Sequence, residues 1–368
     1  MGHRILALII KEFLALFRDK KSRMAVIVPP IFQLLVFGYA ATFDLEHAAL
    51  AILNEDTGGF SRDLAGRFER SSGFEVVGYL RSEAEIAPLI DRGGALLALH
   101  IGPQCSSDAA RGESCNIQVL IDGRNSNTAM LALNYVRSIV SDFNEERAEL
   151  NGVKLPARLN MRAWFNPNLE SRWFIVPGII ALLAMIVTLV VTALSVARER
   201  EAGTFDQLLV TPLRPWEILI GKAMPGLLVG VGEASLIIAV AVFWFKIPLV
   251  GQLSVLYPAL IIYVLSIIGV GLMISSFSAT LQQALLGAFL FIVPAVILSG
   301  FSTPIANMPA FMQALTYLDP MRYFLTIVRR VFLEGAGIEY FWHDLWPMSI
   351  IAAVTLAMAT WLFRHRMY

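Results

Sequence analysis

Long uncharged stretches divide the chain into segments of the length that a membrane-spanning helix needs. A helix crosses the apolar core of a bilayer with about 20 mostly apolar residues. Three stretches of that length contain no Asp, Glu, Lys or Arg, and a fourth contains only Glu233. Residues 247–318 are also uncharged and are long enough for two spans. The pattern predicts six membrane spans, over residues 24–43, 173–197, 220–245, 255–275, 283–300 and 345–363.

The segment between the first two predicted spans, residues 44–172, has a different pattern, in which short apolar runs alternate with helical periodicity. Ser82 has the position of a helix N-cap, whose side chain accepts a backbone N–H. Strands separated by helices are typical of a layered α/β domain, and roughly 130 residues suffice for a core of its own. Strands are predicted at 49–53, 74–80, 95–101 and 116–122, and helices at 61–70, 82–91 and 127–150.

Basic residues cluster at three places that six spans put on the same side of the membrane. Residues 1–23 contain six Lys or Arg, residues 198–222 contain four, and the C-terminal end contains Arg364 and Arg366. Because Lys and Arg are enriched in cytoplasmic loops, both termini are predicted to be cytoplasmic and residues 44–172 to be periplasmic. Three arginines near residue 325 then lie outside, where nearby acidic residues balance them. The predicted fold is a polytopic α-helical membrane protein with an α/β extracytoplasmic domain.

Two further segments are predicted to lie at the membrane without crossing it. Residues 1–23 place apolar side chains at helical spacing with lysines and arginines between them, which is typical of an amphipathic helix on the cytoplasmic face. Residues 301–320 are apolar but interrupted by prolines. They predict a re-entrant hairpin in the outer leaflet, where surrounding protein can shield the backbone. Residues 323–333 are predicted to form an amphipathic helix, and residues 173–368 to form a five-span membrane domain.

The chain offers no constellation of residues for catalysis or for nucleic-acid binding. It is 57% hydrophobic with a formal net charge of zero, so there is no electrostatic case for nucleic acid. No G-x-x-x-x-G-K-[ST], H-E-x-x-H or G-x-S-x-G sequence occurs, and the five histidines are scattered. We therefore expect neither enzyme activity nor a cofactor bound by this chain.

Two cysteines, Cys105 and Cys115, both fall in the segment predicted to be periplasmic. In an oxidising compartment a pair that closes so short a loop predicts a disulfide, and the alternative is two unpaired thiols. A metal site is not expected, because two sulfurs with only His100 nearby fall short of a four-ligand zinc set.

Glu233 is the only carboxylate inside a predicted span. Ionisable groups in a membrane are costly and often mark a function. One interpretation is a site for a proton, a cation or a cationic substrate. The other is a protonated acid that hydrogen-bonds to a neighbouring helix, for which Ser235 and Gln282 are partners of suitable type.

A charged segment follows the second predicted span. We expect residues 199–213 to form a short helix on the cytoplasmic face, with Glu199 and Glu201 near its start, where they complement the positive end of the helix dipole. Gly203 provides a bend, and Pro212 and Pro215 end the helix. The alternative is a charged connector that only fixes the orientation of the spans.

This segment resembles the cytoplasmic stretch of type-2 ABC exporter permeases, whose usual pattern is E-R-E-x-G-T-x-x-Q-L-x-x-[ST]-P. The wider resemblance is to bacterial inner-membrane permeases of the multidrug-export group with a large periplasmic domain. It extends to Asn54-Glu-Asp56, Trp164-Phe-Asn-Pro-Asn168 and Asp319-Pro-Met-Arg322. The residues that match the cytoplasmic pattern are Glu199, Arg200, Glu201, Gly203, Thr204, Gln207, Leu208, Thr211 and Pro212, and Leu213 follows them.

The resemblance implies a set of partners. Such permeases work as homodimers or with a sister permease, and a coupling helix, here residues 199–213, binds a separate ATPase subunit that carries ATP and Mg²⁺. Several relatives also use a periplasmic adaptor protein. The implied substrates are drugs or other amphiphilic small molecules.

Three other functions stay open at this point. A lipid or polysaccharide exporter is one, although the large outer domain counts against polymer export. The second is a cation- or proton-coupled transporter that uses Glu233, although one acid in the spans is few for that class. The third is a receptor, with which no ATPase would co-purify.

Overall fold

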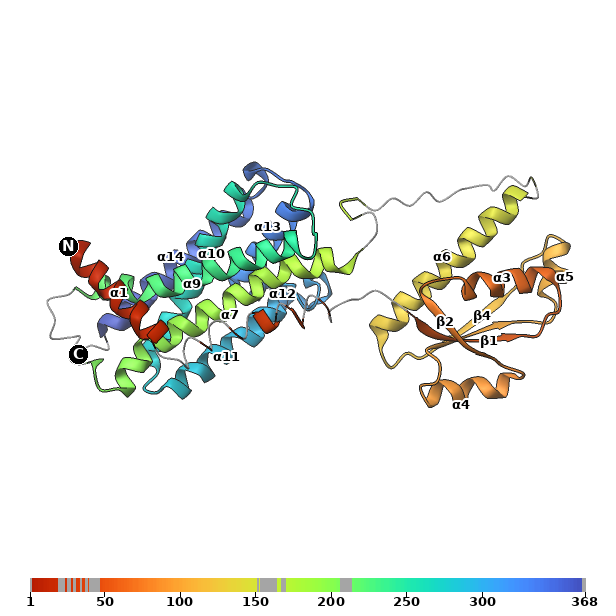
Figure 1. The fold of residues 1–368 in the computed structure, drawn as a ribbon, viewed down its shortest axis with the longest axis horizontal. Coiled ribbons are helices and arrows are strands. Elements are labelled where there is room, and N and C mark those ends of the chain that lie inside the picture. Colours follow the sequence, from red (N-terminus) through yellow and green to blue (C-terminus); the bar gives the residue numbers. More distant parts are fainter. Residues whose placement is uncertain are drawn as a thin grey trace. The chain divides into compact units, whose positions relative to one another are not determined.

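The computed structural model divides the chain into two compact units, one of residues 1–42 and 163–368 and one of residues 43–162 (Figure 1). Twelve of the 20 residues of the predicted first span, 24–43, lie outside the described residues. The structure describes residues 2–18, 47–150, 152, 164–166, 170–205 and 214–365, together with eight positions between 24 and 39.

The smaller unit is a four-stranded sheet with helices on both faces (Figure 1). The strand order is β2-β1-β3-β4; β1 pairs in parallel with β2 and β3, and β3 pairs antiparallel with β4. The four predicted strands are confirmed, with ends that differ by one or two residues. The elements are β1 (Ala48–Asn54), α3 (Gly59–Glu69), β2 (Phe74–Tyr79), η1 (Glu83–Glu85), α4 (Ile86–Asp91), β3 (Leu97–Ile101), α5 (Cys105–Ala110), β4 (Ile117–Ile121) and α6 (Ser126–Leu150).

Strand β1 lies in the middle of this unit and is buried on both faces. Leu50 and Ile52 point toward α3 and α6, where they pack with Phe68. Ala51 and Leu53 point to the opposite face and pack with Ile86 of α4. A strand that is covered on both faces has apolar residues at successive positions, which explains the sequence Ala-Ala-Leu-Ala-Ile-Leu of β1.

Two local predictions for this unit differ from the structure. The predicted helix over residues 82–91 is a 3-10 turn, η1, followed by the short helix α4. Ser82 precedes it but does not cap a backbone N–H, because its hydroxyl donates to the Glu85 carboxylate at 3.3 Å. Helix α5 was not predicted, because six residues are too few to show helical periodicity.

The larger unit is a bundle of long helices. Five helices of the described chain are long and apolar enough to cross a membrane, and they match the second to sixth predicted spans. They are α7 (Ser171–Glu201), α9 (Pro215–Phe243), α10 (Leu253–Phe277), α11 (Leu281–Leu298) and α14 (Trp342–His365). The shorter elements are α1 (Gly2–Arg18), η2 (Ile305–Asn307), α12 (Ala310–Leu315), η3 (Thr316–Leu318), α13 (Pro320–Leu333) and η4 (Ile338–Tyr340).

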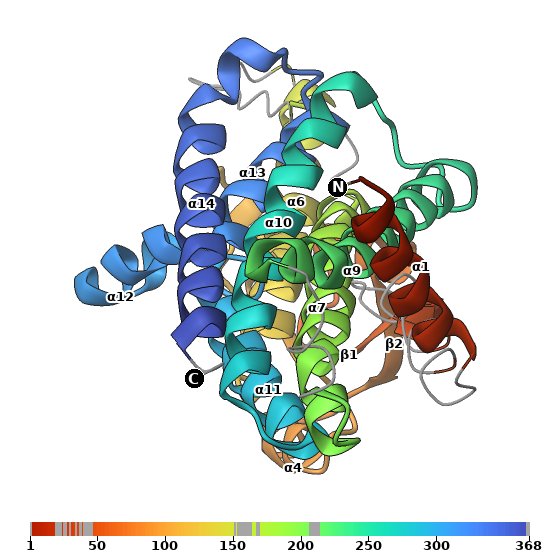
Figure 2. The same ribbon diagram turned by 90° about the vertical axis from the view of Figure 1, so that its left-hand side faces the viewer.

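Helix α7 is the centre of the bundle, with α9, α10 and α11 around it (Figure 2). Its most apolar 18-residue window is 83% buried, against 22% for α11 and α14. Glycines allow this close packing. A Cβ added at Gly226 or Gly271 would overlap Thr192 of α7. Small residues at such contacts let membrane helices approach and gain dispersion energy.

Helix α13 packs into the same core. The predicted amphipathic helix at 323–333 is confirmed, but it begins at Pro320 and buries most of its apolar side chains. Phe324 stacks on Tyr263 of α10, with ring centroids 4.5 Å apart, and the Tyr263 hydroxyl donates to the carbonyl oxygen of Ala181 at 2.9 Å. In the segment before α13, predicted as a re-entrant hairpin, the structure has the short elements η2, α12 and η3.

Candidate functional site at the end of α7

The charged motif singled out in the sequence forms the C-terminal end of α7. The helix ends at Glu201, and Gly203 adopts a left-handed conformation with φ of +68°. The N–H of Gly203 donates to the carbonyl of Arg200 at 3.1 Å, and the N–H of Thr204 donates to that of Glu199 at 3.0 Å. This is a Schellman cap, in which glycine is preferred because side chains disfavour positive φ. The cap explains the spacing of Glu199, Gly203 and Thr204.

The expected position of the two glutamates relative to a helix dipole is wrong. Glu199 and Glu201 lie in the last turn of α7, the negative end of that helix, and not at the start of a following helix. The apolar pattern stops before Arg198, but the backbone helix continues for one further turn. Glu201 instead reaches α11, where its Oε2 accepts the N–H of Leu281, the first residue of that helix, at 2.7 Å. The charge therefore complements the positive end of α11.

Glu199 is part of a group of two carboxylates and two ammonium groups, in which only the Lys11 side chain is half-exposed and the other three are at most 10% exposed. Lys222 of α9 has a fully buried side chain, and its Nζ lies 2.7 Å from Glu199 Oε2 and 3.2 Å from Glu12 Oε1. Its Nζ also donates to the carbonyl oxygen of Ser195 at 3.3 Å. Lys11 of α1 pairs with Glu199 and lies 3.5 Å from Glu12. Each carboxylate contacts both ammonium groups, and such pairing offsets part of the desolvation cost of the buried charges.

Lys11 stays charged in this group. Partial burial disfavours the ammonium form, but the hydrogen bond and the negative charge of Glu199 outweigh burial, so the pKa of Lys11 lies above its ordinary value. The group therefore joins α1, α7 and α9 through ion pairs at neutral pH.

Arg200 and Phe205 extend these contacts to two more helices. The Arg200 guanidinium donates to the carbonyl oxygen of Ser276 at the end of α10, at 3.0 Å, and lies over the Phe205 ring at 4.9 Å. Phe205 is buried, and its ring packs edge-on against Phe363 of α14. We call Glu199–Phe205 together with Lys11, Glu12 and Lys222 the α7 junction. Through it, one segment contacts α1, α9, α10, α11 and α14.

The structure brings together part of the predicted coupling residues. Glu199, Arg200, Glu201, Gly203 and Thr204 lie in the α7 junction. The partners Lys11, Glu12 and Lys222 were not predicted, and the available signal was the lysine inside an otherwise apolar stretch of α9. The other predicted residues, Gln207, Leu208, Pro212 and Leu213, lie outside the described residues.

Glu233 lies in α9, and neither of its carboxylate oxygens, which are buried, has a hydrogen-bond partner in the described part of the chain. The suggested partners do not bond to it. The Ser235 hydroxyl donates to the carbonyl oxygen of Val231 at 2.7 Å and accepts a hydrogen bond from Tyr257 at 2.9 Å. Glu233 is therefore a buried acid that nothing in the described residues neutralises.

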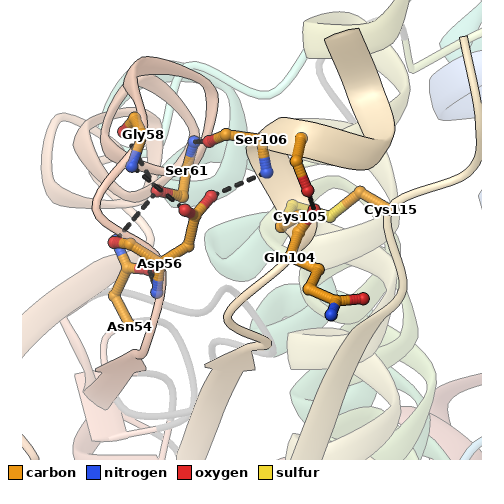
Figure 3. Close-up of a disulfide and its surroundings, with 9 residues drawn as sticks. Asn54, Asp56, Gly58, Ser61, Gln104, Cys105, Ser106 and Cys115 are labelled. Carbon is orange, nitrogen blue, oxygen red and sulfur yellow. Dashed lines mark hydrogen bonds between the residues drawn. A yellow bond between two sulfur atoms is a disulfide. The ribbon is translucent and has the colours of Figure 1, made fainter. Parts of the chain in front are cut away.

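In the smaller unit, the two cysteines and the Asn54-Glu-Asp56 turn form one structure around α5 (Figure 3). The structure joins Cys105 and Cys115 by a disulfide, with Cα atoms 4.6 Å apart. Asp56 accepts the N–H of Ser106 at 2.7 Å and that of Gly58 at 3.0 Å. The carboxylate thus holds the turn after β1 against the first turn of α5. No group of three metal-ligating side chains occurs among the described residues.

Comparison with known proteins gives a consistent result. A model of the ABC-2 family transporter proteins matches residues 20–361. The probable multidrug ABC transporter permease YbhR of Escherichia coli is 41% identical over 366 residues, covering all of both chains. The probable multidrug ABC transporter permease YbhS is 32% identical and covers 90% of this chain and 89% of its own length. The inner membrane transport permease YhhJ is 27% identical over 96% of this chain and 95% of its own.

Proposed function

Because the chain belongs to the ABC-2 transporter family, we propose that it is the permease subunit of an ATP-driven exporter of drugs or other amphiphilic small molecules in a bacterial inner membrane. The names of its relatives support this function. The α7 junction carries the proposal, because one short segment there contacts five other helices. ATP and Mg²⁺ would bind to a separate ATPase subunit, and this chain would have no catalytic role.

The proposed coupling element is the segment 199–213. A displacement of the residues after Gly203 would reach α11 through Glu201, and α1 and α9 through Glu199. Because these contacts are direct ion pairs and hydrogen bonds, a movement of the segment would also move the helices that it contacts. Gln207, Leu208, Pro212 and Leu213 would supply the surface that the ATPase touches.

The proposed assembly includes a second permease, either another copy or a sister chain, and a periplasmic adaptor is a further proposed partner. Helix α11 exposes several large apolar side chains, among them Leu286, Phe289 and Leu290. Such a surface needs lipid or protein to cover it. In this arrangement both termini are cytoplasmic, residues 44–172 are periplasmic and residues 301–320 enter the outer leaflet.

The test is a purification of the tagged chain from its native membranes in mild detergent, with partners identified by mass spectrometry. We expect an ABC ATPase to co-purify, and to be lost when residues 199–207 are replaced by a Gly-Ser segment of equal length. The matched control is Lys246→Ala, which changes an exposed lysine three residues after the C-terminal end of α9. Absence of an ATPase from the wild-type preparation in several detergents would favour a receptor or an ion-coupled transporter.

One observation favours a second candidate function, a transporter coupled to protons or cations. It is the buried carboxylate of Glu233, which lacks a hydrogen-bond partner in the described part of the chain. That function predicts that transport by vesicles stops when an ionophore removes the ion gradient, and that Glu233→Gln has the same effect. ATP-driven transport that survives both treatments would exclude it.

A further inference from the structure

An apolar groove lies between α11 and the short elements that precede α13. It has a volume of about 220 Å³ and is lined by Leu290, Phe291, Pro294 and Leu298 of α11 and by Leu318 of η3. Asp319 is the one polar residue among the described residues that line it. Sites for whole drug-sized ligands usually measure roughly 300–1,000 Å³. This groove therefore has room for one end of an amphiphile.

The Asp319 carboxylate is buried, and only one of its two oxygens has a hydrogen-bond partner in the described residues. The residue is 6% exposed, and its Oδ1 accepts the N–H of Met321 at 2.9 Å as the N-cap of α13. Its Oδ2 is buried and has no hydrogen-bond partner in the described part of the chain. A buried carboxylate oxygen without a partner carries a large desolvation cost. A ligand that brings a positively charged hydrogen-bond donor would remove that cost.

Three donors on neighbouring elements have other hydrogen-bond partners. The Arg322 guanidinium donates to the Thr316 hydroxyl and lies 4.1 Å from the centroid of the Tyr317 ring. The Tyr263 hydroxyl donates to the carbonyl of Ala181, and the Tyr323 hydroxyl donates to that of Tyr317. No ion pair of Asp319 occurs within the described ranges of the chain, and its second oxygen has no hydrogen-bond partner there.

We propose that this groove binds the cationic end of an exported amphiphile, with Asp319 as the residue that selects for positive charge. This inference rests on the proposed export function and narrows its substrates to amphiphiles with a protonated amine or a comparable cationic head. The side chains of α11, Leu318 and the carboxylate provide complementary chemistry for such a molecule: an apolar wall for its body and an anion for its head.

The test measures binding to the purified full-length chain in phosphatidylcholine nanodiscs, without any ATPase. Two fluorescent probes have identical decyl chains and differ only in the head group, which is a primary ammonium in one and a hydroxyl in the other. We expect Asp319→Asn to weaken binding of the ammonium probe by about tenfold or more, the scale of a charged hydrogen bond, and to change the hydroxyl probe little. Asparagine preserves the N-cap acceptor for Met321, so the variant is designed to fold.

Further variants separate charge from shape. Leu298→Ala should weaken the binding of both probes by a similar factor, because it removes only an apolar side chain that lines the groove. Leu318→Lys leaves Asp319 unchanged but adds a tethered ammonium at the groove, and should block the ammonium probe. Glu334→Gln, an exposed acid 3.8 Å from Arg330 and outside the groove, is the matched control.

The outcomes distinguish this inference from the proposed function. Equal weakening of both probes by Asp319→Asn, or no weakening, would overturn the role of Asp319. Loss of ammonium-probe binding in phosphatidylethanolamine nanodiscs would assign the groove to a lipid amine and would overturn the exported occupant. If an ATPase co-purifies but the probes bind the variants and the wild type equally well, only the proposal of a cation-binding groove is rejected. If no ATPase co-purifies, the proposed export function is rejected.

Discussion

The α7 junction and the segment around Asp319 both bury charged side chains, but they treat them in opposite ways. In the junction, Lys222 contacts two carboxylates, and Glu199 contacts two ammonium groups. At the start of α13, Asp319 Oδ2 has no hydrogen-bond partner in the described residues. Paired charges fix the geometry of the helices that carry them. An unpaired buried carboxylate forms no such ion pair between helices, and we have proposed that Asp319 instead binds a cationic ligand.

The largest expected effect comes from breaking a pair in the junction. Lys222→Met leaves the largely buried Glu12 and Glu199 with the half-exposed Lys11 as their one remaining ion-pair partner among the described residues, and should reduce the free energy of unfolding by about 3–5 kcal/mol. The measurement is the midpoint of SDS-induced unfolding of the purified chain. The exposed Lys246→Met serves as the control and should have no measurable effect. Equal midpoints for the two variants would show that the buried pairs do not stabilise the bundle.

The next largest effect is expected from removal of the Cys105–Cys115 disulfide, which extends the comparison to the smaller unit. Reductant or Cys105→Ser should change gel mobility and reduce the stability of the smaller unit by about 2–3 kcal/mol, as loop closure over ten residues predicts. Protease sensitivity of this unit in the purified chain measures the stability. Identical mobility with and without reductant would show that the thiols are free.

A smaller effect is expected where one hydrogen bond links two helices. Glu201→Ala removes the acceptor for the first N–H of α11 and should cost about 1 kcal/mol, the usual value of a lost helix cap. The protein should still insert and assemble, whereas transport should fall strongly because α11 loses a hydrogen bond to the proposed coupling segment. Transport at the wild-type rate would argue against the junction as the transmitting element. Glu201→Gln, which keeps an acceptor, should retain more activity.

Substitution of the unpaired Asp319 should affect stability in the opposite way to substitution of Lys222. Asp319→Asn removes a buried charge without leaving a partner behind and preserves the cap of α13. We expect the SDS midpoint to stay unchanged or to rise slightly, because the desolvation cost of the carboxylate is gone. A loss of stability as large as that of Lys222→Met would contradict the contrast between the two regions.

The smallest expected effect concerns an ion pair at the surface of the smaller unit. His100 Nε2 lies 3.1 Å from Glu55. Partial burial disfavours the charged ring, but the hydrogen bonds to Glu55 and Gln118 outweigh it and raise the pKa of His100. The pair therefore stabilises the fold fully below the unfolded pKa of about 6.5 and loses that contribution as the pH rises through the folded pKa. His100→Gln should remove this slope from unfolding curves between pH 5 and 8.

The sequence predicted the elements well and the contacts between them poorly. The spans followed from uncharged runs whose length alone is diagnostic, and the strands of the smaller unit followed from buried apolar runs. The end of α7 was misplaced because charged residues were read as the limit of a helix, although helix geometry continues until the left-handed Gly203. The partners Lys11 and Lys222 lie 188 and 23 positions from Glu199. Pairing across such separations depends on the packing of helices, which one sequence does not reveal.

The glycine contacts around α7 also restrict where a transported molecule can pass. A route through the interior of one chain would have to separate α7 from α9 and α10, where Gly226 and Gly271 meet Thr192 with no room even for a methyl group. These contacts close the interfaces of α7 with α9 and α10 at both points. In the proposed assembly, a transported molecule would instead pass along the outside of the bundle, next to the sparsely covered α11, and a second permease would form the opposite side of that passage.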